Sequence, residues 1–201
     1  LSMASILVFS SGYASEMKEK RYITPSEYPE NVYFGDAHVH TVMSMDAAAW
    51  GTSKTPEGTY RYARGEEVTS FKGWKTQLTR PLDWLVIADH SDAMGATKAI
   101  MEAPRFALLA NKFLLHWHDM MNESDEGSMR VTAELIDGAA KGTLPESLTD
   151  PEQSRERTAD LWEKHGETVE QYNEPGKFTA FMGFDFTSNT DGANLHRVVM
   201  F

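Results

Sequence analysis

Histidine and aspartate side chains spaced two residues apart occur near the start of the sequence. His38 and His40 flank Val39, and Asp36 continues the same spacing toward the amino terminus. Because side chains alternate along a β-strand, residues two apart project to the same side. Both imidazoles can therefore bind one cation or two adjacent cations, and Asp36 can join them or accept an N–H from a ligating ring.

Residues of the same two types end other apolar segments. Asp89 and His90 end the run Pro81–His90, and Asp185 lies near the end of the run at residues 177–187, whereas His196 lies near the start of its segment. An isolated His-x-His pair is a weak signal. Its combination with an Asp-His pair at the end of a second apolar segment indicates a metal site.

The residue types restrict the chemistry of such a site. The sequence contains no cysteine, which excludes disulfides, zinc–thiolate sites and thiol nucleophiles. Any metal must be bound by His, Asp and Glu, a ligand set that suits Zn, Mn or Fe. Such cations lower the pKa of bound water to about 7 and polarise phosphoryl or carbonyl oxygens, and pairs about 3.5–4 Å apart bind both the attacking and the leaving oxygen. The motifs G-x-S-x-G, H-E-x-x-H, G-x-G-x-x-G and the P-loop do not occur, so metal-assisted hydrolysis has no strong enzymatic rival.

Hydrophobic patterning predicts a scaffold in which strands alternate with helices. The continuous apolar run Trp84–Ala88 is typical of a strand buried on both faces of a parallel sheet. Thr55-Pro56-Glu57 has the cap, proline and acid of a helix start, and Thr149-Asp150-Pro151-Glu152 is a capping-box pattern. We expect strands at residues 31–40, 81–90, 177–187 and 195–201, helices at 55–65, 103–121, 129–140 and 149–174, and a hairpin at 68–79.

This alternation predicts an α/β fold with a largely parallel sheet or barrel. In such folds the functional residues gather at the carboxyl ends of the strands. The histidines and aspartates at residues 36–40, at 89–90 and at 185 fall at these ends. This coincidence is the most informative feature of the sequence.

Composition and charge narrow the class of protein. The 201 residues are 41% hydrophobic, which suits one domain or a piece of a larger one. Because 19 Lys and Arg face 30 Asp and Glu, for a net charge of −11, no nucleic acid partner is expected. No membrane span is expected either, because no segment approaches the ~20 apolar residues that cross a bilayer. We interpret residues 1–15, with Gly12 and Ala14 at the −3 and −1 positions of a signal-peptidase site, as the clipped signal peptide of a periplasmic or secreted protein; the alternative is a buried strand or frayed tail.

Four segments of the chain, in order, resemble a known family. They are GDAHVHT at 35–41, DWLVIADH at 83–90, YNEPGKFTAFMGFDFTS at 172–188 and NLHRVVMF at 194–201. They are similar to the motifs of the PHP (polymerase and histidinol phosphatase) superfamily, most closely to its bacterial DUF3604 branch, whose members often follow a signal peptide. The resemblance covers residues 31–201. It implies a distorted, TIM-like β/α barrel with up to three divalent metals that acts, in most characterised relatives, as a phosphoesterase.

Roles for individual residues follow from the strand spacing and from the resemblance. Asp36, which shares the side of His38 and His40, and Asp89, which the resemblance implies orients His90, are assigned to the catalytic centre. Arg80 and Arg197 adjoin the site strands, where a guanidinium group can bind phosphate oxygens or form a structural salt bridge. The positions that correspond to metal ligands are His38, His40, Asp46, His90, Asp185 and His196.

Two features depart from the family pattern. The bridging position, normally Glu, is Asp185, and a distal motif with an Asp and a His does not occur in the sequence. Residues 16–201 are therefore interpreted as the N-terminal part of a PHP-like hydrolase domain, unless the missing ligands come from elsewhere. We expect a metal-dependent hydrolase, a phosphoesterase that uses metal-activated water at a di- or trinuclear site on a small-molecule substrate. The alternative is a metal-binding or interaction module without turnover.

Overall fold

Three of the predicted strands contribute to one sheet in the computed structural model, which describes residues 29–70, 72–190 and 193–201. β1 (Gly35–Val39), β4 (Trp84–Ile87) and β5 (Thr179–Phe181) form a parallel sheet in the order β1-β4-β5. The elements described below belong to one compact unit, Tyr33–Phe201. The predicted signal peptide at residues 1–15 lies outside the described residues.

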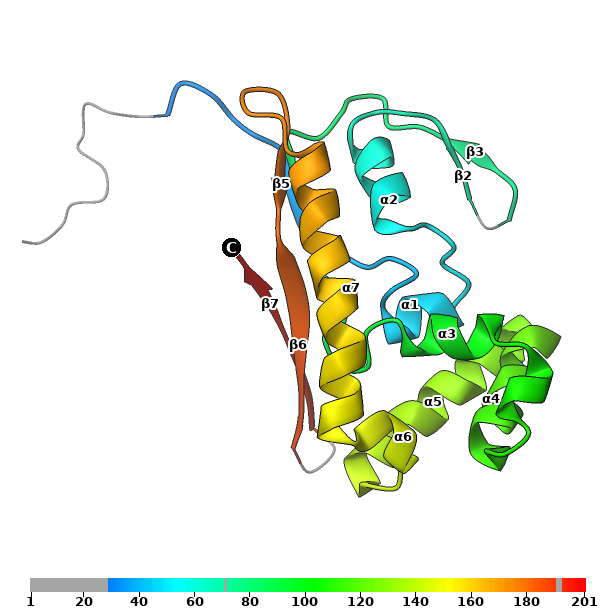
Figure 1. Ribbon diagram of the computed structural model, residues 1–201. Coiled ribbons are helices and arrows are strands. Elements are labelled where there is room, and N and C mark those ends of the chain that lie inside the picture. The colour runs from blue at the N-terminus through cyan, green and yellow to red at the C-terminus, as the bar shows by residue number, and fades with distance from the viewer. Residues whose placement is uncertain (1–28, 71, 191–192) are drawn as a thin grey trace, which may run out of the picture. The chain divides into compact units, whose positions relative to one another are not determined.

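Two helices cover one face of this sheet. α2 (Pro56–Ala63) packs on β4, and the long helix α7 (Pro151–Tyr172) runs beside β5 (Figure 1). Apolar side chains of the strands and of both helices are removed from water between them, which stabilises this layer. The buried residues of this first core are Tyr60, Ala63, Leu85, Ile87, Val169, Phe178 and Ala180.

Side-chain caps fix where both helices begin. The Thr55 hydroxyl accepts a hydrogen bond from the Gly58 N–H at 3.3 Å, as the sequence predicts. Before α7, the carboxylate of Asp150 accepts the Gln153 N–H at 2.8 Å. The cap is therefore Asp150, and Thr149 ends the preceding short helix. A proline follows each cap, where its fixed φ suits the first helical turn.

An antiparallel hairpin continues the line of β5, and its first strand keeps the register of β5 beside the β4 segment, where His90 and Asp185 form a parallel bridge. β6 (Gly183–Thr190) follows β5 after the single residue Met182, and β7 (Ala193–Met200) pairs with it along its whole length. The predicted strand at 177–187 is thus two strands. The predicted strand at 195–201 forms, but it pairs antiparallel with β6 instead of extending the parallel sheet. Consecutive strands separated by so few residues can pair only antiparallel, because a parallel neighbour needs a long crossover.

The fold is α/β with a small parallel sheet. Over the described residues this sheet has three strands and is open, so the strands do not close into a barrel. The predicted hairpin at 68–79 is confirmed as β2 (Val68–Thr69) paired with β3 (Lys75–Thr76).

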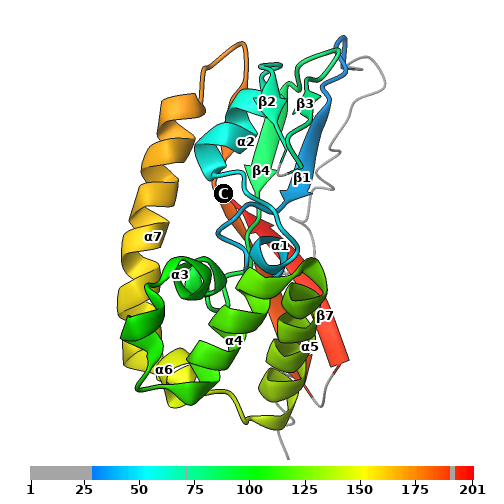
Figure 2. The ribbon, with the colours of Figure 1, turned by 90° about the vertical axis from the view of Figure 1, so that its right-hand side faces the viewer.

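The remaining helices form a second layer with its own core. They gather at the end of the sheet toward which β1 and β4 point (Figure 2). Their buried residues include Ile100, Trp117, Met121, Val131 and Leu135. None of the helices in the described ranges is long and apolar enough to cross a bilayer. The helices are α1 (Met45–Ala49), α3 (Ala96–Glu102), α4 (Lys112–Glu123), α5 (Asp125–Lys141) and α6 (Glu146–Thr149).

The helix predicted at 103–121 is wrong in its first half. A short 3₁₀ helix, η1 (Arg105–Leu108), precedes α4, and Phe106 is 75% exposed. α4 begins only after Asn111, whose side chain accepts the N–H groups of Phe113 and Leu114 at 3.1 Å. Asn111 satisfies the free donors of a new helix start and so separates two segments that share one apolar periodicity.

We expect Gly183→Ala to destabilise the chain by about 1–3 kcal/mol, because overpacking has costs of this size. A Cβ at Gly183 would lie 2.5 Å from Val86 Cγ1 and 2.8 Å from the Val199 carbonyl oxygen. Urea unfolding measures the change. The matched control, Gly58→Ala in α2, meets no atom closer than 3.6 Å and should be neutral or slightly stabilising. Equal effects of the two substitutions would contradict the close packing of β6 on β4.

Candidate metal centre

Strand alternation places His38 of β1, and His40 and His90 just beyond the ends of β1 and β4, on the face opposite the helices. Val39 and Ile87 pack into the first core beneath α2 and α7. Residues at odd spacings from them, His38, His40 and His90, therefore project to the other side, and Asp185 projects there as the parallel partner of His90. The rings of His38 and His40 lie 4.9 Å apart, and those of His40 and His90 also lie 4.9 Å apart.

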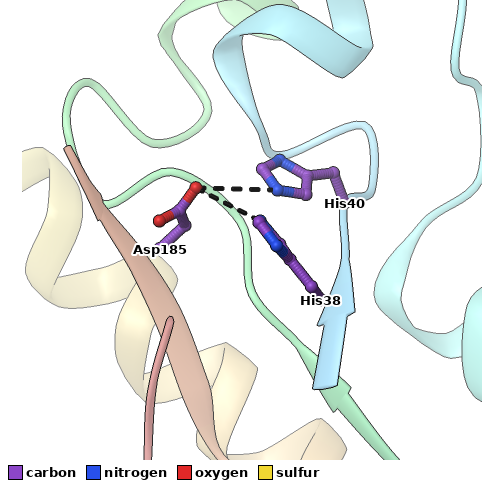
Figure 3. A group of neighbouring side chains, drawn as sticks. All are labelled: His38, His40 and Asp185. Atoms are coloured by element: carbon purple, nitrogen blue, oxygen red, sulfur yellow. Dashed lines mark hydrogen bonds and ion pairs between the residues drawn. The ribbon is translucent and has the colours of Figure 1, made fainter. Parts of the chain in front are cut away.

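One carboxylate oxygen of β6 lies among these rings. Asp185 Oδ2 is 3.3 Å from His38 Nε2 and 3.9 Å from His40 Nε2 (Figure 3). The same oxygen is 3.6 Å from His90 Nδ1 and 2.9 Å from His196 Nδ1. Asp185 is fully buried, and its second oxygen, Oδ1, has no hydrogen-bond partner among the described residues. A buried carboxylate oxygen without a partner is costly, and a cation would satisfy it.

Backbone pairing delivers Asp185 to this position. The Asp185 N–H donates to the Asp89 carbonyl at 3.0 Å, and the Ser91 N–H donates to the Asp185 carbonyl at 3.1 Å. β7 then pairs with β6 so that His196 lies opposite Thr187, two residues beyond Asp185 on the same face. His196 therefore reaches the cluster from an antiparallel strand, and its place near the start of that strand is no obstacle.

Ser44 determines which nitrogen of His40 faces the cluster. The Ser44 hydroxyl donates to Asp46 Oδ1 at 2.7 Å, since a carboxylate only accepts. It therefore accepts from His40 Nδ1 at 2.7 Å, and also from the backbone N–H of His90 at 3.2 Å. With its proton on Nδ1, His40 presents the lone pair of Nε2 to Asp185 Oδ2. Two acceptors that face each other in this way favour a cation between them.

The side chains form overlapping groups with the spacing of metal ligands. Donor atoms about 2.0–2.1 Å from a tetrahedral Zn ion lie about 3.3–3.4 Å from one another. In each group, the possible ligand atoms all lie within 4.8 Å of one another. Over the described residues the groups are His38, His40 and Asp185; His40, Asp46 and His90; and His90, Asp185 and His196.

Counting lone pairs selects among these groups. A neutral imidazole has one lone pair, so each histidine serves one cation. Assigning His38 and His40 to one cation and His90 and His196 to a second uses all four imidazoles. Asp185 then contributes to both groups, as a bridging carboxylate would. Asp46 lies 3.5 Å from His40 Nδ1 and 3.5 Å from His90 Nε2. This assignment does not use Asp46, so its carboxylate remains available to a third cation.

The electrostatics of the cluster favour positive charge. Burial raises the pKa of Asp46, but hydrogen bonds from His40, His90 and Ser44 outweigh it and hold that pKa well below its usual range. Burial lowers the pKa of His90, but the hydrogen bond and charge of Asp46, followed by the charges of Asp185 and Asp92, raise it above its ordinary value. The site thus stabilises carboxylates together with positive partners, which protons or metal ions can supply.

Comparison with known proteins identifies the family. The family model described as "Protein of unknown function (DUF3604)" matches residues 27–201. The chain belongs to the DUF3604 family. No curated protein and no solved structure matches the sequence. Membership of DUF3604 confirms that part of the resemblance found in the sequence, and it brings no activity with it.

Asp89 has a different position in this DUF3604 chain from the one predicted. Its carboxylate accepts the backbone N–H of Thr41 and, at 2.7 Å, the Thr41 hydroxyl. Burial raises the pKa of Asp89, and the hydrogen bonds from Thr41 counteract that rise. Asp89 shares the helix-covered side with Ile87, so alternation turns it away from His90. It joins the ends of β1 and β4, and its hydrogen bonds come from Thr41 and not from the ring of His90.

Three other predicted site residues are not brought into the cluster. Asp36 is exposed, and its Oδ1 accepts the backbone N–H of His38 at 2.9 Å rather than that of a ring. Arg80 lies at the amino end of β4, where it pairs with Asp83 at 3.4 Å, so the salt-bridge alternative holds for it. Arg197 is exposed on β7, and alternation places it on the face opposite His196.

Sequence reasoning missed two hydroxyl groups of the site. Thr187 Oγ1 lies 2.8 Å from His90 Nδ1, and its spacing of two from Asp185 on one strand could have indicated it. Ser44 lies in the turn between His40 and α1, where no periodicity applies. Only the folded turn shows that Ser44 bridges His40 and Asp46.

We expect this DUF3604 chain, loaded with Zn, Mn or Fe, to contain at least two metal equivalents by plasma mass spectrometry. His38→Ala and His90→Ala should each lose about one equivalent, whereas Asp185→Asn should lose both, because Asp185 belongs to both groups. The control is His116→Ala, which removes a 55% exposed histidine of α4 and should keep the full content. Unchanged metal content in Asp185→Asn would contradict the shared carboxylate.

Ser44→Ala should weaken metal binding by about 10–100-fold, the usual effect of removing a group that orients a ligand. The substitution leaves His40 Nδ1 and Asp46 Oδ1 without their common partner. Competition with a chromophoric chelator measures the affinity. Ser91→Ala is the matched control, because its hydroxyl donates to the Asp185 carbonyl at 3.3 Å and, in the described part of the chain, to no candidate ligand atom. The metal affinity of this variant should stay near that of the unmodified chain. Similar losses in both variants would show that Ser44 does not act through His40.

Proposed function

We propose that this DUF3604 chain belongs to a metal-dependent hydrolase of the PHP type that acts on phosphoesters. The observation that carries the proposal is the buried Asp185 carboxylate, which four imidazoles approach with one oxygen left unpartnered. The order of the four sequence motifs and the match to DUF3604 support the PHP part of the proposal.

The ligands present fit two cations of the Zn, Mn or Fe class. Imidazole and carboxylate donors suit these metals, and Asp46 provides a carboxylate for a third. Divalent cations, if bound by these residues, would supply an ionised water near neutral pH and would polarise a phosphoryl oxygen. No separate protein base is required for such a reaction.

The other residues of the chain hold the ligands in place. Ser44 fixes the ring of His40, and Thr187 contacts His90. Asp89 and Thr41 join the ends of β1 and β4, so the spacing between His40 and His90 is set by buried hydrogen bonds. A site held on rigid strands with such support keeps its ligands in one geometry, which metal-assisted reactions require.

A panel of phosphomonoesters and phosphodiesters tests the proposal with chain loaded with Mn or Zn. We expect release of the alcohol or of phosphate from at least one class. Asp185→Asn should lower kcat/KM by at least about 100-fold, because metal ions contribute several kcal/mol to the transition state. His116→Ala should retain the unmodified rate.

A chain that binds two cations and hydrolyses no member of the panel would overturn the hydrolase proposal. It would support the alternative predicted from the sequence, a metal-binding module without turnover. Hydrolysis that persists in Asp185→Asn would place the active centre elsewhere.

A further inference from the structure

A cavity of about 500 Å³ opens directly beside the candidate metal ligands. Asp46, His90 and His196 form part of its wall, and the segment Ser91–Ala93 after β4 continues it. Cavities of about 300–1,000 Å³ hold drug-sized ligands. A substrate whose reacting group lies at the metal ligands can therefore extend its remaining part into this cavity.

Most of the remaining wall is apolar. The apolar part is formed by α1, by α5 and by the segment that leads from α5 through α6, whereas Ser154, Thr187 and Asn194 add polar side chains. The hydroxyl of Thr132, which also lines the cavity, is already used, because it donates to the Ser128 carbonyl at 3.1 Å. The large apolar side chains of the wall are Met45, Trp50, Leu135, Ile136, Leu144 and Leu148.

The charges around the cavity exclude a second anionic group. Among the described residues that line it there is no Lys or Arg, and its acidic side chains are Asp46 and Asp92. A polyphosphate or a second phosphate would meet two carboxylates and no fixed cation away from the metals. Phosphate recognition ordinarily uses guanidinium or ammonium groups. Nucleotides and sugar bisphosphates therefore do not fit this wall.

Two of the apolar side chains are well exposed although they face the cavity. Trp50 is 61% exposed and Ile136 is 45% exposed. Covering them with an apolar group removes their surface from water, which is favourable in proportion to the area buried. The cavity thus has an anion-binding end at the metal ligands and a wall that gains from an apolar ligand.

We propose that this cavity binds the apolar alcohol part of the substrate, so that the substrate class is a phosphoester of an alkyl or aryl alcohol without a second charged group. The proposal rests on the proposed function for the phosphoester. The preference for an apolar group follows from the cavity and can be measured as binding alone. Each methylene that enters the cavity should raise affinity by about fourfold, until the cavity is filled.

The binding test uses n-alkylphosphonates with one, four and eight carbons, whose P–C bond is not hydrolysed. Isothermal titration calorimetry of the metal-loaded chain should show affinity rising with chain length. The heat-capacity change should become more negative over the same series, the signature of apolar burial. A terminal carboxylate on the four-carbon chain should weaken binding. Affinity that does not depend on chain length would overturn the proposal.

Variants on one helix assign the effect to the wall. Ile136→Ser should reduce the gain in affinity per methylene, and its partial exposure makes it tolerable to the fold. The matched control is Met129→Ser, which changes a 53% exposed residue of the same helix α5 that does not line the cavity. This control should keep the unmodified chain-length dependence. An equal reduction in both variants would place the apolar group elsewhere.

Turnover of n-alkyl phosphates from propyl to octyl separates this proposal from the proposed function. The leaving alcohols of this series have nearly equal reactivity, so differences in kcat/KM report binding of the chain. We expect kcat/KM to rise from propyl to octyl. Hydrolysis with binding that is flat across the series would overturn the apolar preference and leave the hydrolase standing. Chain-length-dependent binding without hydrolysis of any ester would overturn the hydrolase proposal and leave the apolar preference standing.

Discussion

A fully buried carboxylate at the meeting point of β1, β4 and β6 sets the requirements for the rest of the structure. Removing Asp185 from water costs several kcal/mol unless positive charge compensates for it. The four imidazoles around its Oδ2 are the groups that bring such compensation, either as bound protons or as ligands of cations. The ends of β1 and β4 and the hairpin contribute these groups, and the turn before α1 contributes Ser44, which holds the ring of His40.

Strand alternation divides the ends of β1 and β4 into two layers with different tasks. Thr41 and Asp89 face the helices and join the two strands through buried hydrogen bonds. His40 and His90, their immediate neighbours in the sequence, face β6 and the candidate metals. In each of the pairs His40-Thr41 and Asp89-His90, one residue is therefore a candidate ligand and the other forms a hydrogen bond between the two strands. This arrangement explains why an aspartate beside a ligand need not be a ligand itself.

The sequence predicted the parts of the site that depend on local periodicity or on family motifs. The shared side of His38 and His40 follows from strand alternation, and the resemblance indicated Asp46, Asp185 and His196. The partner of Asp89 lies 48 positions away, and such a tertiary contact leaves no local pattern. Arg80 precedes β4 in the sequence, which already placed it at the amino end of the strand. The candidate ligands lie at the carboxyl end, so adjacency to the strand alone did not bring Arg80 to the site.

The fold showed the same division between local and tertiary information. The caps of α2 and α7 and the apolar run of β4 are local signals, and these elements form close to where they were expected. The single residue between β5 and β6 carries no comparable signal, so the change from parallel sheet to hairpin was missed. Likewise, Asn111 separates η1 from α4 inside a stretch whose apolar spacing is continuous.

The distance along the chain between the ligands has a consequence for assembly. His38 and Asp185 are 147 positions apart, and two of the ligand groups in the described residues require Asp185. During synthesis from the amino terminus, the imidazoles of β1 and β4 emerge long before the carboxylate that completes their groups. Closing so long a loop has an entropic cost that the sheet and both cores must first offset. The metals would thus bind late, after the scaffold has folded, and would link the beginning of the unit to its end.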